Sequence, residues 1–239
     1  MATQTDPSAR PRAPLTRERV LRAAITLADQ GGTDGLSMRR LGERLQVEAM
    51  SLYNHVANKS DLLDGMVDLV FSEISLASDR AGWKRAMRER AISAREALRR
   101  HPWATSLMQS RTRPGPATLR HHNWVIGKLR QAGFDIEMAA HAFSAIDGYV
   151  YGFALQQANM PIQTPAQVVE LGANILRQLR AAELPYLAEM IEYATKPGYD
   201  YGKEFEFGLD VVLDGLEGRM HMAQGRDRNT TGGTPQRRS

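Results

Sequence analysis

Residues 36–66 read LSMRRLGERLQVEAMSLYNHVANKSDLLDGM, and the architecture of the chain can be worked out from this segment. Ser37 is a good N-cap for a short helix that runs to Leu45. A turn of two or three residues leads to another short helix over residues 49–55. Asn58, with an aspartate three residues later, approximates a capping box for a longer helix that runs on to residue 74. Two short helices joined by so tight a turn form a helix-turn-helix.

The helix over residues 49–55 has little apolar surface of its own. Six apolar residues can make the internal contacts of the motif: Leu36, Leu41, Leu45, Val47, Leu52 and Val56. The outer faces then carry Ala49, Met50, Ser51, Tyr53, Asn54 and His55. A helix of less than two turns fits a major groove about 12 Å wide, and hydroxyl and amide groups suit phosphate oxygens and base edges. We therefore predict that this helix binds double-stranded DNA.

Two cations flank this helix in the sequence. Arg39 lies in the first turn of the preceding helix, and Lys59 takes the first position of the following one. A cation at a helix N-terminus opposes the helix dipole, whereas a DNA phosphate at the same place would be stabilised by both. Either cation alone is better explained as a solvated surface charge. Two of them beside one short helix favour phosphate contacts.

Helix signals also cover the rest of the chain, without convincing strand alternation, so the expected fold class is all-α. The first helix begins after the N-cap Thr16 and ends at the glycine pair 31–32. Beyond residue 80 the expected helices are longer on average, and they cover residues 83–99, 104–110, 117–132, 135–159, a stretch that starts at 164–167, and 201–222.

These signals divide the chain into two domains with polar ends. We expect a disordered arm over residues 1–14 and a three-helix DNA-binding domain over 15–60, with the helix-turn-helix at about 37–56. A larger helical domain for ligand binding and dimerisation follows over 61–223. The polar, Gly-rich residues 224–239 are expected to form a disordered tail.

Composition excludes several classes of protein. The 239 residues are 42% hydrophobic and 24% charged, as in a soluble globular protein. No secretory signal is visible, and the longest apolar run, 139–155, contains His141 and Asp147, so we expect a cytoplasmic protein without a membrane role. A net charge of +4 mildly favours an anionic partner.

The sequence offers no catalytic or metal-binding pattern. Cysteine is absent, which excludes disulfides, thiolate metal sites and a cysteine nucleophile. No HExxH, nucleophile elbow, P-loop or Rossmann glycine pattern is present. The adjacent His121 and His122 would point about 100° apart on a helix. They cannot share a metal as an i, i+4 pair could, and we expect them at the surface or an interface. We predict no enzyme activity, no metal and no cofactor.

Residues 16–74, and above all the segment quoted first, resemble the DNA-binding domain of the tetracycline-repressor (TetR) family of transcriptional regulators. Leu-Tyr-Asn-His at 52–55 matches the Leu-Tyr-x-His signature of that family. By position, the resemblance implies a phosphate or base contact from Arg39, the opening of the recognition helix at Ala49, Met50 and Ser51, DNA-backbone contacts from Tyr53 and His55, and a phosphate contact from Lys59.

Residues 131–134, 142–149 and 207–216 also resemble the second domain of the tetracycline repressor, after which the family is named. That repressor holds a metal–drug chelate through a histidine and a glutamate. Where those ligands would stand, this sequence reads SLMQ at 106–109 and LQQ at 155–157. A metal–tetracycline complex is therefore not the expected effector, although the architecture is retained.

Apolar residues recur at helical spacing from Phe143 to Ala154, with Asp147 inside the pattern. One interpretation is core or dimer packing, with Asp147 paired to an arginine. The other is the wall of an effector pocket, with Asp147 as a polar group that orients an apolar ligand. Adaptable methionines and large aromatic faces would complete such a pocket. The candidate ligand-binding residues are Met87, Trp103, Met108, Trp124, Met138, Phe143, Asp147 and Tyr151.

The last expected helix is apolar on more than one face, so more than its own domain must bury it. We expect it to form half of a four-helix bundle between two subunits, together with the helix that starts near Asp135, as the resemblance also implies. A buried helix of a monomer is the alternative. The sequence thus predicts a homodimeric repressor that a small, mostly apolar molecule releases from a palindromic operator. The rival is a helical small-molecule carrier or enzyme in which the helix-turn-helix is incidental packing.

Overall fold

The computed structural model describes residues 14–78, 80–110, 113–160 and 165–231, and it contains only helices over these ranges. The predicted all-α fold is confirmed. The elements are α1 (Arg17–Gly31), α2 (Met38–Leu45), the 3-10 helix η1 (Ala49–Asn54), α3 (Lys59–Ser72), α4 (Trp83–Arg100), α5 (Ala104–Ser110), α6 (Pro116–Gln131), α7 (Ile136–Ala158), α8 (Pro165–Ala181), α9 (Pro185–Ala194) and α10 (Tyr201–Thr231).

Side-chain caps set the starts of the first helices, as the sequence predicts. The side chain of Thr16 accepts a hydrogen bond from the amide of Arg19, that of Ser37 from Arg40, and that of Asn58 from Asp61. Each cap satisfies an amide that the helix itself leaves unpaired. These caps fix where α1, α2 and α3 begin.

The segment predicted as the recognition helix is helical, but it is not an α-helix. Residues 49–54 form a 3-10 helix, and His55 follows it as the C-terminal cap. The amide of Ser51 bonds the carbonyl of Glu48 and that of His55 bonds Leu52, three residues back in each case. Glu48 provides no side-chain cap, and helical pieces this short commonly wind as 3-10 helices.

The absence of a side chain at Gly42 allows η1 to lie close to α2. It is buried in the middle of α2, where a Cβ would come 2.8 Å from the carbonyl oxygen of Val47 and 3.3 Å from the amide nitrogen of Ala49. Both are backbone atoms that cannot swing away, so a glycine is required although it weakens a helix interior. The chain then reverses at Gln46 in the left-handed conformation, with φ 57°.

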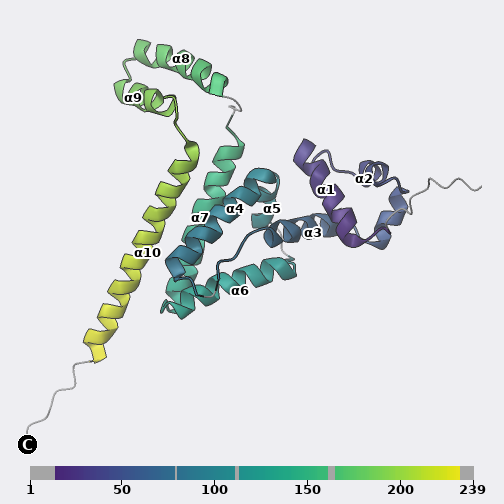
Figure 1. Ribbon diagram of the computed structural model, residues 1–239, viewed down its shortest axis with the longest axis horizontal. Coiled ribbons are helices and arrows are strands. Elements are labelled where there is room, and N and C mark those ends of the chain that lie inside the picture. Colours follow the sequence, from purple (N-terminus) through teal and green to yellow (C-terminus); the bar gives the residue numbers. More distant parts are fainter. Residues whose placement is uncertain (1–13, 79, 111–112, 161–164, 232–239) are drawn as a thin grey trace, which may run out of the picture.

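Helix α3 connects the two halves of the molecule (Figure 1). It packs against α1 on one side and α6 on the other, with Leu62, Met66 and Val70 buried along its length. It ends at Ser72, two residues before the predicted end. The expected domain boundary between residues 60 and 61 falls inside this helix.

The larger half is built around α4, α7 and α10, which pack against one another. Aromatic rings of α7 and α10 stack across their contact: Phe153 on Tyr201 at 4.7 Å between ring centroids and Tyr149 on Phe205 at 5.5 Å. At the surface, Arg88 of α4 pairs with two carboxylates of α10. Helices α5 and α6 complete this half of the molecule.

Helices α8 and α9 pack mainly against each other and project from the rest of the chain (Figure 1). The sequence analysis did not predict α9, which begins with Pro185 at its first turn. Helix α10 continues to Thr231, so the first eight residues of the expected tail are helical. Residues 1–13 of the expected arm lie outside the described residues, and so do the expected N-cap Thr164 and residues 232–239 of the expected tail.

Candidate nucleic-acid interface

Three of the predicted DNA-contacting side chains stand exposed on η1. Met50 is 75% exposed, and Tyr53 and Asn54 are exposed beside it. Leu52 points the opposite way and is completely buried in the core of the small domain. A short helix anchored by one leucine thus presents a methionine, a phenol and an amide to solvent.

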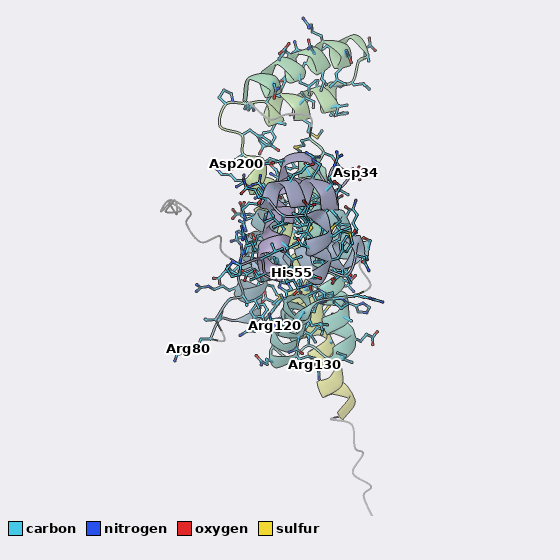
Figure 2. The ribbon with its side chains drawn as sticks, turned by 90° about the vertical axis from the view of Figure 1, so that its right-hand side faces the viewer. Asp34, His55, Arg80, Arg120, Arg130 and Asp200 are labelled. Atoms are coloured by element: carbon cyan, nitrogen blue, oxygen red, sulfur yellow. The ribbon has the colours of Figure 1, made fainter. Side chains whose placement is uncertain are left out.

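The other three predicted positions on this segment are half-buried. Ala49 lies against Gly42, and the hydroxyl of Ser51 donates to the carbonyl of Glu48 at 2.7 Å. His55 is half-buried at the end of η1, on the face turned toward the viewer in Figure 2, and its carbonyl accepts from Arg17 at 2.7 Å. Ser51 therefore has a competing partner inside its own turn.

The two predicted phosphate-binding cations lie at helix starts, as expected. Lys59 is the first residue of α3 and is exposed. Arg39 lies in the first turn of α2 with its side chain 85% exposed, and its Nε is 3.6 Å from a carboxylate oxygen of Glu43. That ion pair is weak because both groups are solvated, so it leaves Arg39 able to turn toward a phosphate.

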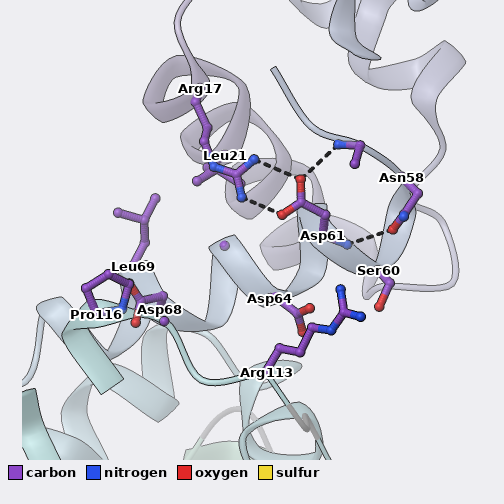
Figure 3. A pocket seen from close by; sticks show the side chains of 13 residues that line it. Arg17, Leu21, Asn58, Ser60, Asp61, Asp64, Asp68, Leu69, Arg113 and Pro116 are labelled. Carbon is purple, nitrogen blue, oxygen red and sulfur yellow. Dashed lines mark hydrogen bonds and ion pairs between the residues drawn. The ribbon is translucent and has the colours of Figure 1, made fainter. Parts of the chain in front are cut away.

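A bidentate ion pair holds the interface onto α1 (Figure 3). The Nη1 and Nη2 atoms of Arg17 donate to the two oxygens of Asp61 at 2.9 and 2.7 Å. Asp61 also accepts from the amide of Ala57 at 2.8 Å. The Arg17 hydrogen bonds lower the pKa of Asp61 to about 2. Local sequence predicts Asp61 only as part of a cap, and it gives no sign of Arg17, whose partner lies 44 residues away.

Asp68 of α3 caps a helix of the larger domain. Its carboxylate accepts hydrogen bonds from the amides of Ala117 and Thr118, at 3.2 and 2.8 Å, and from the Thr118 hydroxyl at 2.9 Å. Gly115 precedes α6, and a Cβ there would overlap the Asp68 carboxylate. Figure 3 shows the cleft of about 800 Å³ that separates this contact from the Arg17–Asp61 pair.

A second set of contacts joins the two halves around His101. Its Nδ1 lies 2.8 Å from Asp29 of α1, and its Nε2 lies 3.2 Å from Glu73 at the end of α3. The indole nitrogen of Trp103 donates to the same Asp29 oxygen at 2.7 Å. Trp103, predicted as a ligand-binding residue, therefore packs at the junction with the DNA-binding half. Sequence spacing gives no sign of the contacts with Asp29, because His101 and Trp103 are 72 and 74 residues from it.

The remaining predicted effector residues lie in the core of the larger half. Met87 and Tyr151 are buried, and Met108, Trp124, Met138 and Phe143 are partly buried against the core. None of them lines the cleft of about 500 Å³ beside Trp83, or the two clefts of about 800 and 430 Å³ elsewhere in the described residues. The smallest of these three lies between α7, α8, α9 and α10, among Met160, Leu171 and Ile191.

Asp147 forms a buried ion pair with Arg90 of α4, the arrangement that the core-packing interpretation predicts. The Arg90 Nη2 and Asp147 Oδ1 atoms are 2.6 Å apart, and Arg90 is 1% exposed. The Arg90 Nε donates to Nε2 of His121 at 2.9 Å. A signal for Arg90 existed in the sequence, because it stands in the apolar stripe of α4 between Met87 and Ala94.

We expected His121 at the surface or at an interface, and its burial contradicts the surface alternative. Its ring packs edge-on against Phe71 of α3, with ring centroids 5.3 Å apart. Burial and the neighbouring Arg90 lower the pKa of His121 to about 3. The imidazole is therefore neutral in the folded protein at any pH at which the protein would be handled.

Stability should fall on mild acidification because of His121. The unfolded chain takes up a proton near pH 6.5, whereas the folded chain does not until about pH 3. The contribution is fully present above pH 6.5 and is lost as the pH falls below it. Between pH 7 and pH 5 we expect a loss of about 2 kcal/mol that the His121→Gln variant does not show.

Denaturant unfolding at several pH values measures this effect. His141→Gln is the matched control, because that histidine is exposed on α7. It should keep the pH dependence of the parent chain. Equal acid sensitivity of the parent and His121→Gln chains would contradict the assignment.

The described residues contain no cluster of three or more histidine and acidic side chains able to hold a metal ion. No helix in the part of the chain that the structure covers is long and apolar enough to cross a membrane.

Two family models match the chain. Residues 20–66 match the model described as bacterial regulatory proteins of the tetR family, and residues 77–220 match the tetracycline repressor-like C-terminal domain. The first match ends within α3, and the second begins at residue 77, beyond the end of that helix. Together they include η1, Arg39 and Lys59 in the first match and the Arg90–Asp147 pair in the second.

Named relatives match over most of this chain. The HTH-type transcriptional repressor DrrR1 of Streptomyces coeruleorubidus is 34% identical over 220 residues, which are 88% of this chain and 80% of that repressor. The tetracycline repressor protein class C of Escherichia coli is 31% identical over 208 residues, 85% of this chain and 91% of the repressor.

Solved structures are also similar to this chain over most of its length. Apo ActR of Streptomyces coelicolor matches with a TM-score of 0.73 at 29% identity, covering 88% of this chain and 99% of ActR. ActR in complex with actinorhodin matches with a TM-score of 0.71 at 29% identity, covering 87% and 99%. With an exposed helix-turn-helix at one end and these likenesses along most of its length, the chain belongs to the TetR family of helix-turn-helix transcriptional regulators.

Proposed function

We propose that this regulator is a repressor that binds a palindromic operator as a homodimer, in the cytoplasm, and leaves it when a small, mostly apolar molecule binds the larger domain. The observation that carries the proposal is the exposure of Met50, Tyr53 and Asn54 on η1, with Lys59 at the adjacent helix start. No catalytic role is part of the proposal.

The DNA contacts divide into two kinds. Met50, Asn54 and the start of η1 at Ala49 and Ser51 would meet base edges in the major groove. A second set would bind phosphates and fix the position of the protein on the duplex, and it consists of Arg39, Tyr53, His55 and Lys59. Because Ala49, Ser51 and His55 are half-buried, we expect Met50, Tyr53 and Asn54 to provide most of the contact area.

The proposed dimer uses one face of α7 and one face of α10, here named the dimer face and consisting of Gly148, Gly152, Leu155, Phe207 and Val211. The three large residues are exposed in the single chain. A Cβ at either glycine would meet none of the described atoms within 4 Å. Small residues beside exposed apolar ones let two helices approach closely, so a second subunit would bury this surface.

The effector would bind between α4, α6 and α7, among the core residues named above. A ligand releases the protein from DNA only if it binds the released conformation more tightly than the DNA-bound one. The contacts of Asp68, His101 and Trp103 between the two halves support this coupling. ActR in complex with actinorhodin shows a structural relative that binds a small molecule.

A mobility-shift assay on the promoter region of the protein's own gene tests the proposal directly. Retention of one duplex in preference to a random duplex of equal length is the expected result. Binding of neither duplex at low ionic strength would contradict it, and would favour a helical carrier protein instead.

Lys59→Ala tests the phosphate contact. Losing one Lys–phosphate contact should weaken binding to operator and random duplex alike, and lower the slope of log affinity against log salt by about one. A fluorescence-anisotropy titration over a range of salt concentrations measures the slope. Lys203→Ala is the matched control, since Lys203 is exposed on α10 far from η1 along the chain. If both variants keep the parent slope, Lys59 does not touch the DNA.

A further inference from the structure

We infer that Arg90, His121 and Asp147 form the polar anchor of the effector site, and that this anchor takes a neutral carbonyl oxygen carried on an aromatic ring. The inference rests on the proposed function, because it names the chemical class of the molecule that the larger domain senses. The three residues come from α4, α6 and α7 and meet in the interior of that domain.

The hydrogen bonds within the cluster leave donors unused. Arg90 Nε donates to Nε2 of His121, so that nitrogen is unprotonated and the neutral ring carries its proton on Nδ1. The Nδ1 atom of His121 and the Nη1 atom of Arg90 are both buried and have no hydrogen-bond partner among the described residues. An unsatisfied buried donor costs about 1–3 kcal/mol. An acceptor atom supplied by a ligand to Nη1 of Arg90 would remove the cost of that unsatisfied donor.

The ion pair itself is also incompletely bonded. Arg90 Nη2 and Asp147 Oδ1 are 2.6 Å apart, but neither atom has a partner in hydrogen-bond geometry within the described part of the chain. The contact neutralises the two charges, but it does not satisfy the hydrogen-bonding capacity of either atom. The Nη1 and Nη2 donors are therefore available to an incoming oxygen while Nη2 stays beside its counter-ion.

Charge balance selects a neutral acceptor. Arg90 and Asp147 cancel, and His121 is held neutral by burial. A carboxylate or phosphate would add an unbalanced negative charge next to Asp147 in a buried region, which is strongly unfavourable. A carbonyl oxygen adds no charge and can accept a hydrogen bond from Nη1 of Arg90.

Aromatic rings surround the donors. Phe71 of α3 packs edge-on against His121 and His122 at centroid distances of 5.3 and 5.4 Å, and Phe143 packs edge-on against His122 at 5.2 Å. Trp124 and Met87 lie in the same core. The edges and faces of these rings pack well against a flat aromatic ligand. Because Phe71 belongs to α3, a ring inserted here would press on the helix that begins at Lys59.

The experiment compares pairs of aromatic compounds that differ only by a carbonyl against a methylene group: indanone with indane, fluorenone with fluorene, and xanthone with xanthene. Dissociation constants are measured by equilibrium dialysis on the full-length protein without DNA. We expect at least one ketone to bind about tenfold or more tightly than its methylene partner, the equivalent of one well-made hydrogen bond.

The double variant Arg90→Met with Asp147→Leu removes the Nη1 donor and the ion pair without leaving an unpaired charge. In it the two members of each pair should bind within about twofold of each other. The matched control is Arg88→Met with Asp210→Leu, which makes the same changes in a solvated ion pair that also starts from α4. That control should keep the preference for the ketone.

Nitrogen NMR of the parent chain gives a second readout that needs no variant. The Nδ1–H resonance of His121 should move when the ketone is added and stay in place with the methylene compound. Equal binding within every pair, no binding by any ketone, or a preference that survives in the double variant would each overturn the inference. Because no DNA is present, these outcomes are independent of whether the protein binds an operator.

Discussion

Arg90→Met should lower the free energy of unfolding by about 3–5 kcal/mol, the largest effect we expect from a single substitution outside the helix-turn-helix. The change leaves the Asp147 carboxylate in a buried position without its counter-ion, and removing one partner of a buried ion pair is costly for that reason. Methionine fills a similar volume, so little of the loss should come from a cavity.

Adding Asp147→Leu to Arg90→Met should recover most of the lost stability, because no unpaired charge then remains. Urea unfolding of the parent, the single variant and the double variant measures both effects. Arg88→Met is the control, since that arginine pairs with half-exposed carboxylates and should cost no more than about 1 kcal/mol. If Arg90→Met cost no more than Arg88→Met, the pair would contribute nothing to folding.

Val211→Asp should convert the protein to a monomer. Val211 lies at the centre of the dimer face on α10, one turn from Phe207, and both are more than half exposed in the single chain. Burying two aspartates against each other across a symmetric interface leaves both charges unpaired. Analytical ultracentrifugation at micromolar concentration should show the molecular mass halved.

Loss of the dimer should also weaken operator binding by about 100-fold or more. A dimer binds its second half-site as an intramolecular step, and that advantage disappears for single subunits. Leu119→Asp is the control, because Leu119 is an apolar residue of α6 with 54% exposure that lies outside the dimer face. It should leave both mass and affinity unchanged. A Val211→Asp protein that remains dimeric would place the interface elsewhere.

The sequence predicted best what neighbouring residues determine. Thr16, Ser37, Asn58 and Asp135 are all N-caps in the structure, because a cap depends on an oxygen and an amide only a few residues apart. The ends of α5 were also predicted correctly. The exposed residues of η1 follow in the same way from the pattern around Leu52.

Features that depend on distant pairs escaped prediction. The Arg17–Asp61 and Arg90–Asp147 pairs join residues 44 and 57 positions apart, and only the folded chain shows which arginine meets which carboxylate. Burial of His121 was missed because the partner that tolerates it, Arg90, was not recognised. Helix α9 was missed because its apolar residues, Tyr186, Leu187 and Met190, are exposed and give no buried stripe.

The carboxylate of Asp68 makes the start of α6 conditional on another helix. The residue that precedes α6, Gly115, has no side chain with which to cap it, so two of its first amides depend on α3. Hydrogen bonds of 2.8 and 3.2 Å are lost if the helices slide by little more than an ångström. The first turn of α6 would then unwind, and a small displacement would become an all-or-nothing change in the number of helical residues.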